Sequence, residues 1–223
     1  MQRIIVYFMF MFMTAASGSF AVEGVLETAY QGKAPLPLKN TVAPPLLAEK
    51  NEYYEISGCS EHELHHDLKK KCIPGNNGKK FDSITTWDVK WDYDHESAPG
   101  TCAAESFMVT VDIIYRYPKW TRTGEVPQLL VEKWDRYLQN LILHEKGHRD
   151  MVAEAAAELT RAVADLPPAP TCSQLDRKVR ALSRERMEKL KEDQNKYDAD
   201  TKHGATQGAI FPCECSLAGR KSK

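Results

Sequence analysis

The longest regular pattern in the chain runs from Gln128 to Asp165, where apolar residues recur at intervals of three and four. This spacing predicts one long amphipathic helix, because positions three or four apart lie on the same helix face. The stretch LPPAP then ends the helix, since proline cannot continue it. A second helix is expected from about Ser173, a suitable N-cap, to Lys196. Together they predict an antiparallel helical hairpin.

Alternation with a period of two precedes these helices. Three stretches rich in aromatic and β-branched residues are typical of strands, namely NEYYEISG from Asn51, SITTWDVKWDYD from Ser83 and ESFMVTVDIIYRYPKW from Glu105. Strands with one apolar face and one solvent-exposed face are typical of antiparallel sheets, so antiparallel pairing is predicted. Pro118 is expected to end the third strand. A short helix is expected at 60–70. The predicted fold class is therefore α+β, a small antiparallel sheet followed by a long two-helix hairpin.

Residues 1–21 contain an early arginine, an apolar run and an A-x-A-like exit ending at Ala21. These features predict a cleaved secretory signal peptide, because the apolar run is shorter than the roughly 20 residues of a membrane span. An uncleaved N-terminal anchor is the alternative. Proline-rich residues 22–50 are expected to form a leader, 51–212 the domain and 213–223 a tail. The protein is therefore expected in the periplasm or secreted, with no stable membrane insertion after cleavage.

The charges of the chain are almost balanced, with 30 basic and 31 acidic residues and a formal net charge of −1. A nucleic acid or an anionic membrane is usually recognised by a surplus of basic residues. We therefore expect neither as a partner.

The chain has an even number of cysteines, and in an exported protein an even number favours disulfide bonds. The cysteines are Cys59, Cys72, Cys102, Cys172, Cys213 and Cys215. The expected pairs are Cys59 with Cys72 and Cys102 with Cys172, while the two cysteines of the tail lie too close in sequence for an easy mutual bridge. An alternative for the first pair is a structural zinc site shared with nearby histidines. Those histidines are His62, His65 and His66.

The first long helix contains the pattern His-Glu-x-x-His at His144, Glu145 and His148. Histidines four apart point the same way and can offer two imidazole nitrogens to one zinc ion. The apolar stripe continues from Leu141 onto both histidines, which places them on the buried face, where a metal would satisfy them. Glu145 lies beside the pair, as expected for a general base. The alternative is two hydrogen-bonded core histidines with a solvated Glu145.

A third zinc ligand is expected where the second helix returns to the histidines. About 17 residues, or roughly 26 Å of helix, follow His148, so residues from about 190 onward arrive level with it. The segment YDADTKHG at 197–204 is expected to be irregular and to reach the site. His203 is the preferred third ligand and Asp198 the alternative. A glutamate version of the site would use Glu188 or Glu192.

The same geometry brings Tyr197 to the site. Its hydroxyl is a candidate for stabilising the charge that develops on an attacked carbonyl oxygen. The alternative is a tyrosine that packs the end of the second helix.

The chain resembles the predicted secreted zinc-dependent proteases of bacteria, a family otherwise catalogued as a domain of unknown function. The resemblance covers about residues 50–212 and rests on YYEISG, FDSITTWDVKWDY, YRYPKW, WDRYLQNLILHEKGHRD, YDADTKHGATQGAIFP, Cys102 and Cys172. It implies a zincin-like, metallopeptidase-like active site with His144, Glu145 and His148. It marks as family positions Asp198, Thr201, His203 and Gly204, and it implies no particular substrate.

The expected function is that of a secreted or periplasmic zinc metallopeptidase, which hydrolyses a peptide or protein substrate with Glu145 as general base. One alternative is a non-catalytic envelope module for binding or assembly that keeps the same fold. A zinc amidase acting on cell-wall peptides is another. Glu145 argues against the non-catalytic module, because a purely structural metal needs no general base beside its ligands.

Overall fold

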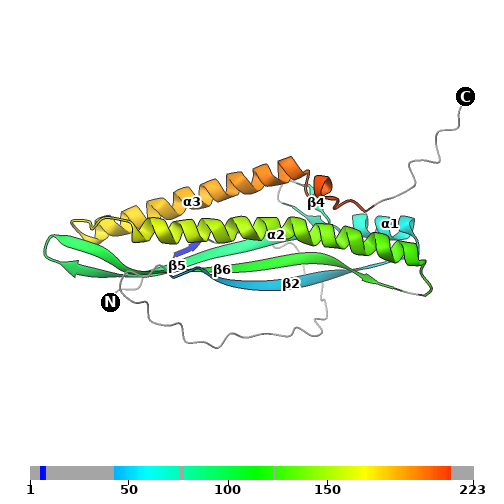
Figure 1. Cartoon of the computed structure of the whole chain (residues 1–223), viewed down its shortest axis with the longest axis horizontal. Helices are drawn as coiled ribbons and strands as arrows, with labels where there is room; N and C mark the ends of the chain where they lie inside the picture. The colour runs from blue at the N-terminus through cyan, green and yellow to red at the C-terminus, as the bar shows by residue number, and fades with distance from the viewer. Residues whose placement is uncertain (1–5, 9–42, 76–77, 123, 212–223) are drawn as a thin grey trace, which may run out of the picture.

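A computed structural model describes residues 6–8, 43–75, 78–122 and 124–211. The elements are β1 (Val6–Phe8), β2 (Leu46–Ser57), α1 (Glu61–Lys71), β3 (Ile73–Pro74), β4 (Lys80–Phe81), β5 (Ile84–Ala98), β6 (Thr101–Thr121), α2 (Gln128–Ala164), α3 (Cys172–Thr201) and the 3-10 helix η1 (Ala205–Gln207). The long helices α2 and α3 run antiparallel along one face of an elongated sheet (Figure 1). This arrangement confirms the predicted α+β class and the helical hairpin.

The main sheet is mixed, with the strand order β1-β5-β6-β2. β5 and β6 form the predicted antiparallel hairpin, but β2 pairs in parallel with β6, from Leu46 beside Thr110 to Ser57 beside Thr121. The prediction of a purely antiparallel sheet was therefore wrong. Alternating apolar and polar side chains show that one face of a strand is exposed. They do not show whether the strand runs parallel or antiparallel to its neighbours. Direction is decided by the connection, and α1 and β5 intervene between β2 and β6.

All three predicted strands extend beyond their predicted ends. β2 begins at Leu46, inside the segment expected to be a leader, β5 continues to Ala98, and β6 runs from Thr101 through Pro118 to Thr121. The proline is tolerated because β5 pairs with β6 only as far as Arg116, so its missing N–H breaks no bond to β5.

The N-terminal segment is described only at β1, whose residues pair antiparallel with Trp91, Lys90 and Val89 of β5. The remainder of the predicted signal peptide and of residues 22–42 lies outside the described residues, as do Pro212 and the tail. None of the described helices is long and apolar enough to cross a membrane.

Two apolar clusters support α2. The larger lies between the sheet and both long helices, and its fully buried members include Val109, Val111, Val152, Leu159, Leu175 and Val179. The smaller joins α1 to the start of α2 and includes Leu64, Leu68, Trp134, Tyr137, Leu141 and Phe211. The segment from His144 to His148 lies between these clusters along the helix, so packed turns on both sides fix its orientation.

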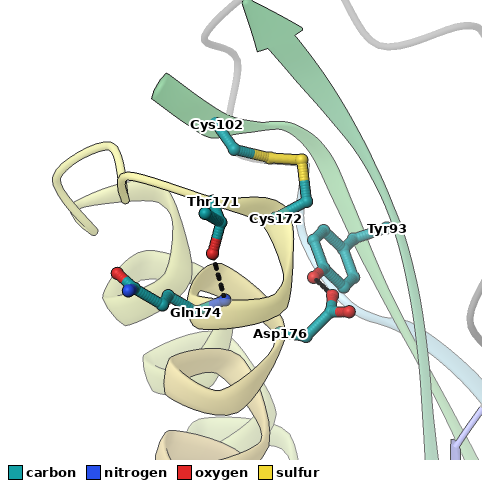
Figure 2. The surroundings of a disulfide bond; sticks show 6 residues. All are labelled: Tyr93, Cys102, Thr171, Cys172, Gln174 and Asp176. Carbon is teal, nitrogen blue, oxygen red and sulfur yellow. Dashed lines mark hydrogen bonds between the residues drawn. A yellow bond between two sulfur atoms is a disulfide. The ribbon is translucent and has the colours of Figure 1, made fainter. Parts of the chain in front are cut away.

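A disulfide between Cys102 and Cys172 joins the start of β6 to the first turn of α3 (Figure 2). It confirms the predicted pair. Backbone hydrogen bonds between Cys102 and Ala169 lie beside it, at 2.7 and 2.8 Å. The hydroxyl of Tyr93 on β5 also donates to Asp176 on α3. The beginning of α3 is therefore fastened to the β5–β6 hairpin.

The N-cap of α3 is Thr171 and not the predicted Ser173. Its hydroxyl oxygen accepts a hydrogen bond from the backbone N–H of Gln174, at 3.3 Å (Figure 2). Both residues are good N-caps. The difference follows from the extended backbone of Thr171, which lets the helix begin at Cys172.

Cys59 and Cys72 are not joined to each other, so this predicted pair was wrong. The thiol of Cys72 instead donates to the carbonyl oxygen of Lys69, at 2.9 Å. The 11 residues of α1 separate the two cysteines. A helix of that length spans about 16 Å, whereas a disulfide requires Cα atoms within about 7 Å. The same separation argues against the alternative zinc site that would use both cysteines. Cys213 and Cys215 lie outside the described residues.

Candidate metal centre

Three side chains lie close together between the two long helices, two from the middle of α2 and one from the end of α3. His144 and His148 are 3% and 7% exposed, and their rings lie 4.9 Å apart. Asp198, in the last turn of α3, places its Oδ1 atom 3.3 Å from His144 Nε2 and 3.1 Å from His148 Nε2. The ligand atoms of the three residues lie within 4.8 Å of one another. They form a group that could hold a metal ion.

The helix α3 reaches Asp198 because it continues to Thr201, past the predicted end at Lys196. The expectation that 197–204 would be irregular was therefore wrong for its first half. Thr201 organises the helix end: its hydroxyl donates to the carbonyl oxygen of Tyr197 at 2.7 Å and accepts from the N–H of Gly204 at 3.3 Å. These bonds join the last turn of α3 to the left-handed turn that follows it.

His203 lies just beyond the helix, in a left-handed turn with φ 53°. Its Nδ1 atom is 3.4 Å from Asp198 Oδ1, and its ring contacts Phe81 with the centroids 5.1 Å apart. His203 is therefore next to the group, and the three residues that could hold a metal ion include Asp198, the alternative third ligand, instead of His203. The two glutamates of the predicted glutamate version, Glu188 and Glu192, are exposed and lie outside the group.

Gly204 completes this turn with φ 81°. A Cβ atom there would lie 3.0 Å from Cγ of His144, closer than side chains normally pack. Only glycine therefore lets the turn close against the imidazole of His144.

Each buried imidazole is oriented by a glutamine. His148 Nδ1 lies 2.7 Å from Gln194 Oε1, and His144 Nδ1 lies 2.9 Å from Gln207 Oε1. The glutamine NH₂ groups donate elsewhere, to the carbonyl oxygen of His148 at 3.1 Å and to the Tyr197 hydroxyl at 3.0 Å. The amide oxygens therefore face the imidazoles, each Nδ1 donates, and each Nε2 keeps a lone pair for the centre of the group.

The group needs a positive charge at its centre. Two Nε2 lone pairs and one carboxylate oxygen are all acceptors, so their contacts repel unless a cation or a proton lies between them. Burial acts against a charged His148, but its hydrogen bond to Asp198 and the nearby Glu145 outweigh burial and raise its pKa. Burial also acts against a charged Asp198, but the two histidines hold its pKa well below the usual carboxyl range. The residues therefore fit a metal ion.

Glu145 is buried, with 3% of its surface exposed. Its carboxylate accepts hydrogen bonds from two hydroxyls at the start of β5, from Ser83 to Oε1 and from Thr85 to Oε2, the latter at 2.6 Å. The alternative of a solvated Glu145 was therefore wrong. Sequence reasoning missed both hydroxyls and both glutamines. The available signal was that Ser83 and Thr85 lie in FDSITTW and Gln207 in YDADTKHGATQGAIFP, two stretches shared with the resembled family, whereas Gln194 lies in neither.

Tyr197 packs behind the histidines. Its ring stacks on His144 with the centroids 5.1 Å apart and meets His148 edge-on at 5.0 Å. Its hydroxyl lies 3.3 Å from the backbone carbonyl oxygen of His144, to which it donates. Tyr197 does not line the cleft at the site. The predicted role in stabilising a carbonyl oxygen is therefore not supported, and the packing alternative describes the observed geometry.

Gly147 is required by this packing, because a Cβ atom there would overlap the hydroxyl of Tyr197. An ordinary Gly→Ala change in a helix stabilises by about 1 kcal/mol. We expect Gly147→Ala instead to lower the free energy of unfolding by about 1–3 kcal/mol, because overpacking must displace Tyr197. Urea titration measures this change, with Lys146→Ala, at an exposed neighbouring position, as the control. A stability gain in Gly147→Ala would contradict the packing described here.

A cleft of about 1150 Å³ opens in front of the group. Its walls come from α1, β4, β5, α2 and the end of α3, and they include the three residues of the group, Glu145, Ser83 and Thr85. A ligand in this cleft can therefore reach the candidate metal position and the buried carboxylate together.

Fold and site together define an α+β domain in which two histidines and an aspartate form a candidate metal centre beside a buried glutamate. The chain belongs to the family described as bacterial protein of unknown function (DUF922), whose model matches residues 51–204. No curated protein and no solved structure matches the chain.

Proposed function

We propose that the protein is a zinc-dependent metallopeptidase of the cell envelope. The observation that carries this proposal is the buried carboxylate of Glu145, held by two hydroxyls in the same cleft as the candidate metal ligands. Burying a carboxylate costs several kcal/mol unless it is compensated. A fold that needed only a structural metal would gain nothing from this residue, whereas hydrolysis needs a base in this position.

Zinc suits the donor set of His144, His148 and Asp198. Ligand atoms around a tetrahedral zinc with bonds of 2.0–2.1 Å are about 3.3 Å apart, and Asp198 Oδ1 lies 3.1 and 3.3 Å from the two Nε2 atoms. Two histidines and one carboxylate are also a known set for catalytic zinc. When bound, zinc would polarise a peptide carbonyl and lower the pKa of a coordinated water to about 7.

The side chains of the site supply proton transfer and positioning. Glu145 accepts a proton from the water that attacks the peptide carbon and passes it to the leaving nitrogen when the C–N bond breaks. Ser83 and Thr85 hold its carboxylate in place. Gln194 and Gln207 hold the imidazoles in the tautomer that keeps both Nε2 atoms available as ligands. Tyr197 is a positioning residue, stacked on the first histidine.

Two further functions could use the same fold. A non-catalytic envelope module for binding or assembly could keep the metal centre, but it would have no use for Glu145. A zinc amidase acting on cell-wall peptides differs from a peptidase only in its substrate, and no feature of the described cleft favours it. The peptidase is therefore the function that we propose.

We further propose that the protein acts in the periplasm or outside the cell. The Cys102–Cys172 disulfide supports this location, because such bonds persist in oxidising compartments. The predicted signal peptide would direct the chain there.

Metal removal tests the proposal directly. The purified protein should cleave some members of a mixed peptide library, and a chelator such as 1,10-phenanthroline should abolish this cleavage. Adding back zinc to the dialysed protein should restore it, whereas magnesium should not, because nitrogen ligands disfavour magnesium. Cleavage that survives complete removal of the metal would contradict a zinc-dependent mechanism.

A further inference from the structure

The cleft beyond the candidate metal centre is rich in lysine. Five line it, on α1, around β4 and on α3: Lys69, Lys79, Lys80, Lys191 and Lys202. Five carboxylates line the same cleft, namely Asp82, Asp88, Asp112, Glu145 and Asp198. The effect of the lysines on an anionic ligand therefore depends on which of them these carboxylates neutralise.

The carboxylates that line the cleft have partners of their own. Asp82 pairs with Lys69 at 3.2 Å. Asp88 and Asp112 both pair with Lys90, from the adjoining part of β5. The two remaining carboxylates belong to the site, where Asp198 faces the histidines and Glu145 accepts from two hydroxyls. The acidic residues of the cleft therefore leave part of its lysine charge uncompensated.

Lys80 and Lys202 carry that charge. Within the described part of the chain neither has an ion-pair partner, and both are exposed at the cleft. The contact between the rings of Phe81 and His203 brings β4 against the end of α3. Lys80 precedes Phe81 in sequence and Lys202 precedes His203, so the two ammonium groups belong to segments that meet beside Asp198.

We propose that the substrate of this site is a peptide with a carboxylate close to the scissile bond, which Lys80 and Lys202 bind. This inference rests on the proposed peptidase function and narrows its substrate class. With zinc bound, the charge of the metal is balanced by Asp198 and Glu145, so the two lysines give the site a net positive charge. The carboxylate could belong to an aspartate or glutamate side chain or to a free C-terminus, and the test separates these sources.

An exposed ion pair contributes modestly, so the expected preferences are moderate. Each lysine should favour an acidic peptide over its neutral counterpart by about two- to fivefold, and both together by about tenfold. The preference should shrink when the salt concentration rises, because exposed charges are screened.

The test uses three fluorescent peptides that differ only in their carboxylates: one with a glutamate beside the scissile bond, one with glutamine there, and one with glutamine and a free C-terminus where the first two carry an amide. Binding is measured by fluorescence anisotropy on zinc-loaded Glu145→Gln protein, and cleavage is measured on protein with Glu145 intact. The proteins compared are the wild type, Lys80→Gln, Lys202→Gln and the double variant. Lys178→Gln, an exposed position of α3 outside the cleft, is the matched control.

We expect one carboxylate-bearing peptide to bind about tenfold more tightly than the neutral peptide, and the double variant to lose this preference while Lys178→Gln keeps it. The peptide that shows the preference identifies the source of the carboxylate. Equal binding of acidic and neutral peptides, no binding at all, or a preference that survives in the double variant would overturn the inference. Cleavage without an acidic preference would leave the peptidase proposal intact, and lysine-dependent binding without cleavage would remove the peptidase proposal alone.

Discussion

Glu145→Gln is expected to lower kcat/KM for peptide hydrolysis by about 10²- to 10⁴-fold, the usual contribution of a general base. Glutamine has the same shape as glutamate but cannot accept the proton of the attacking water. Its amide oxygen still accepts a hydrogen bond from one of the two hydroxyls that hold Glu145, and a hydroxyl oxygen can accept from its NH₂ group. The variant should therefore fold and bind metal like the wild type.

A loss of activity with unchanged zinc content and stability can be attributed to the missing general base. Zinc content and thermal midpoint are measured on the same preparations as kcat/KM. Glu154→Gln, an exposed glutamate of α2, is the matched control and should change none of the three. Wild-type activity in Glu145→Gln would contradict the assignment of Glu145 as general base, whereas a wild-type protein that cleaves no peptide would favour the non-catalytic module.

The helical part of the site could be predicted because it depends on local periodicity. Residues four apart on a helix share a face whatever surrounds it, so the inward direction of His144 and His148 followed from the apolar stripe of α2. The part of the second helix that lies level with the histidines could also be predicted, because both helices have the same rise per residue. These two regularities were sufficient to bring 197–204 to the histidines.

The identity of the third residue depended on where α3 ends. If the helix had stopped at Lys196, a flexible loop could have aimed His203 at the centre. The helix instead continues to Thr201, which puts Asp198 in its last turn and His203 in the turn beyond. The residue at which a helix ends is less well determined by apolar periodicity than the face that the helix buries.

The supporting residues could not be predicted for a related reason. Ser83 and Thr85 reach Glu145 across the sheet–helix interface, and Gln194 and Gln207 reach the histidines from separate segments. No sequence spacing relates residues brought together only by tertiary packing. The parallel pairing of β2 with β6 is a similar case, because an alternating pattern does not report strand direction.

Asp198→Ala is expected to weaken zinc binding by at least about 100-fold, more than the loss of an outer residue costs at a metal site. The carboxylate is the only negatively charged member of the group of three, so its removal also leaves two neutral imidazoles to hold a dication. His203→Ala should have a smaller effect, since His203 is partly exposed and lies outside that group. Asp200→Ala, an exposed aspartate of the same helix end, is the matched control.

The central claim is that His144, His148 and Asp198 form a metal centre, and its most direct test is the zinc stoichiometry of these proteins after dialysis against a weak competing chelator. We expect close to one zinc per chain in the wild type and in Asp200→Ala, and almost none in Asp198→Ala. A wild-type protein without bound metal, or an Asp198→Ala variant that keeps its zinc while His203→Ala loses it, would contradict this assignment.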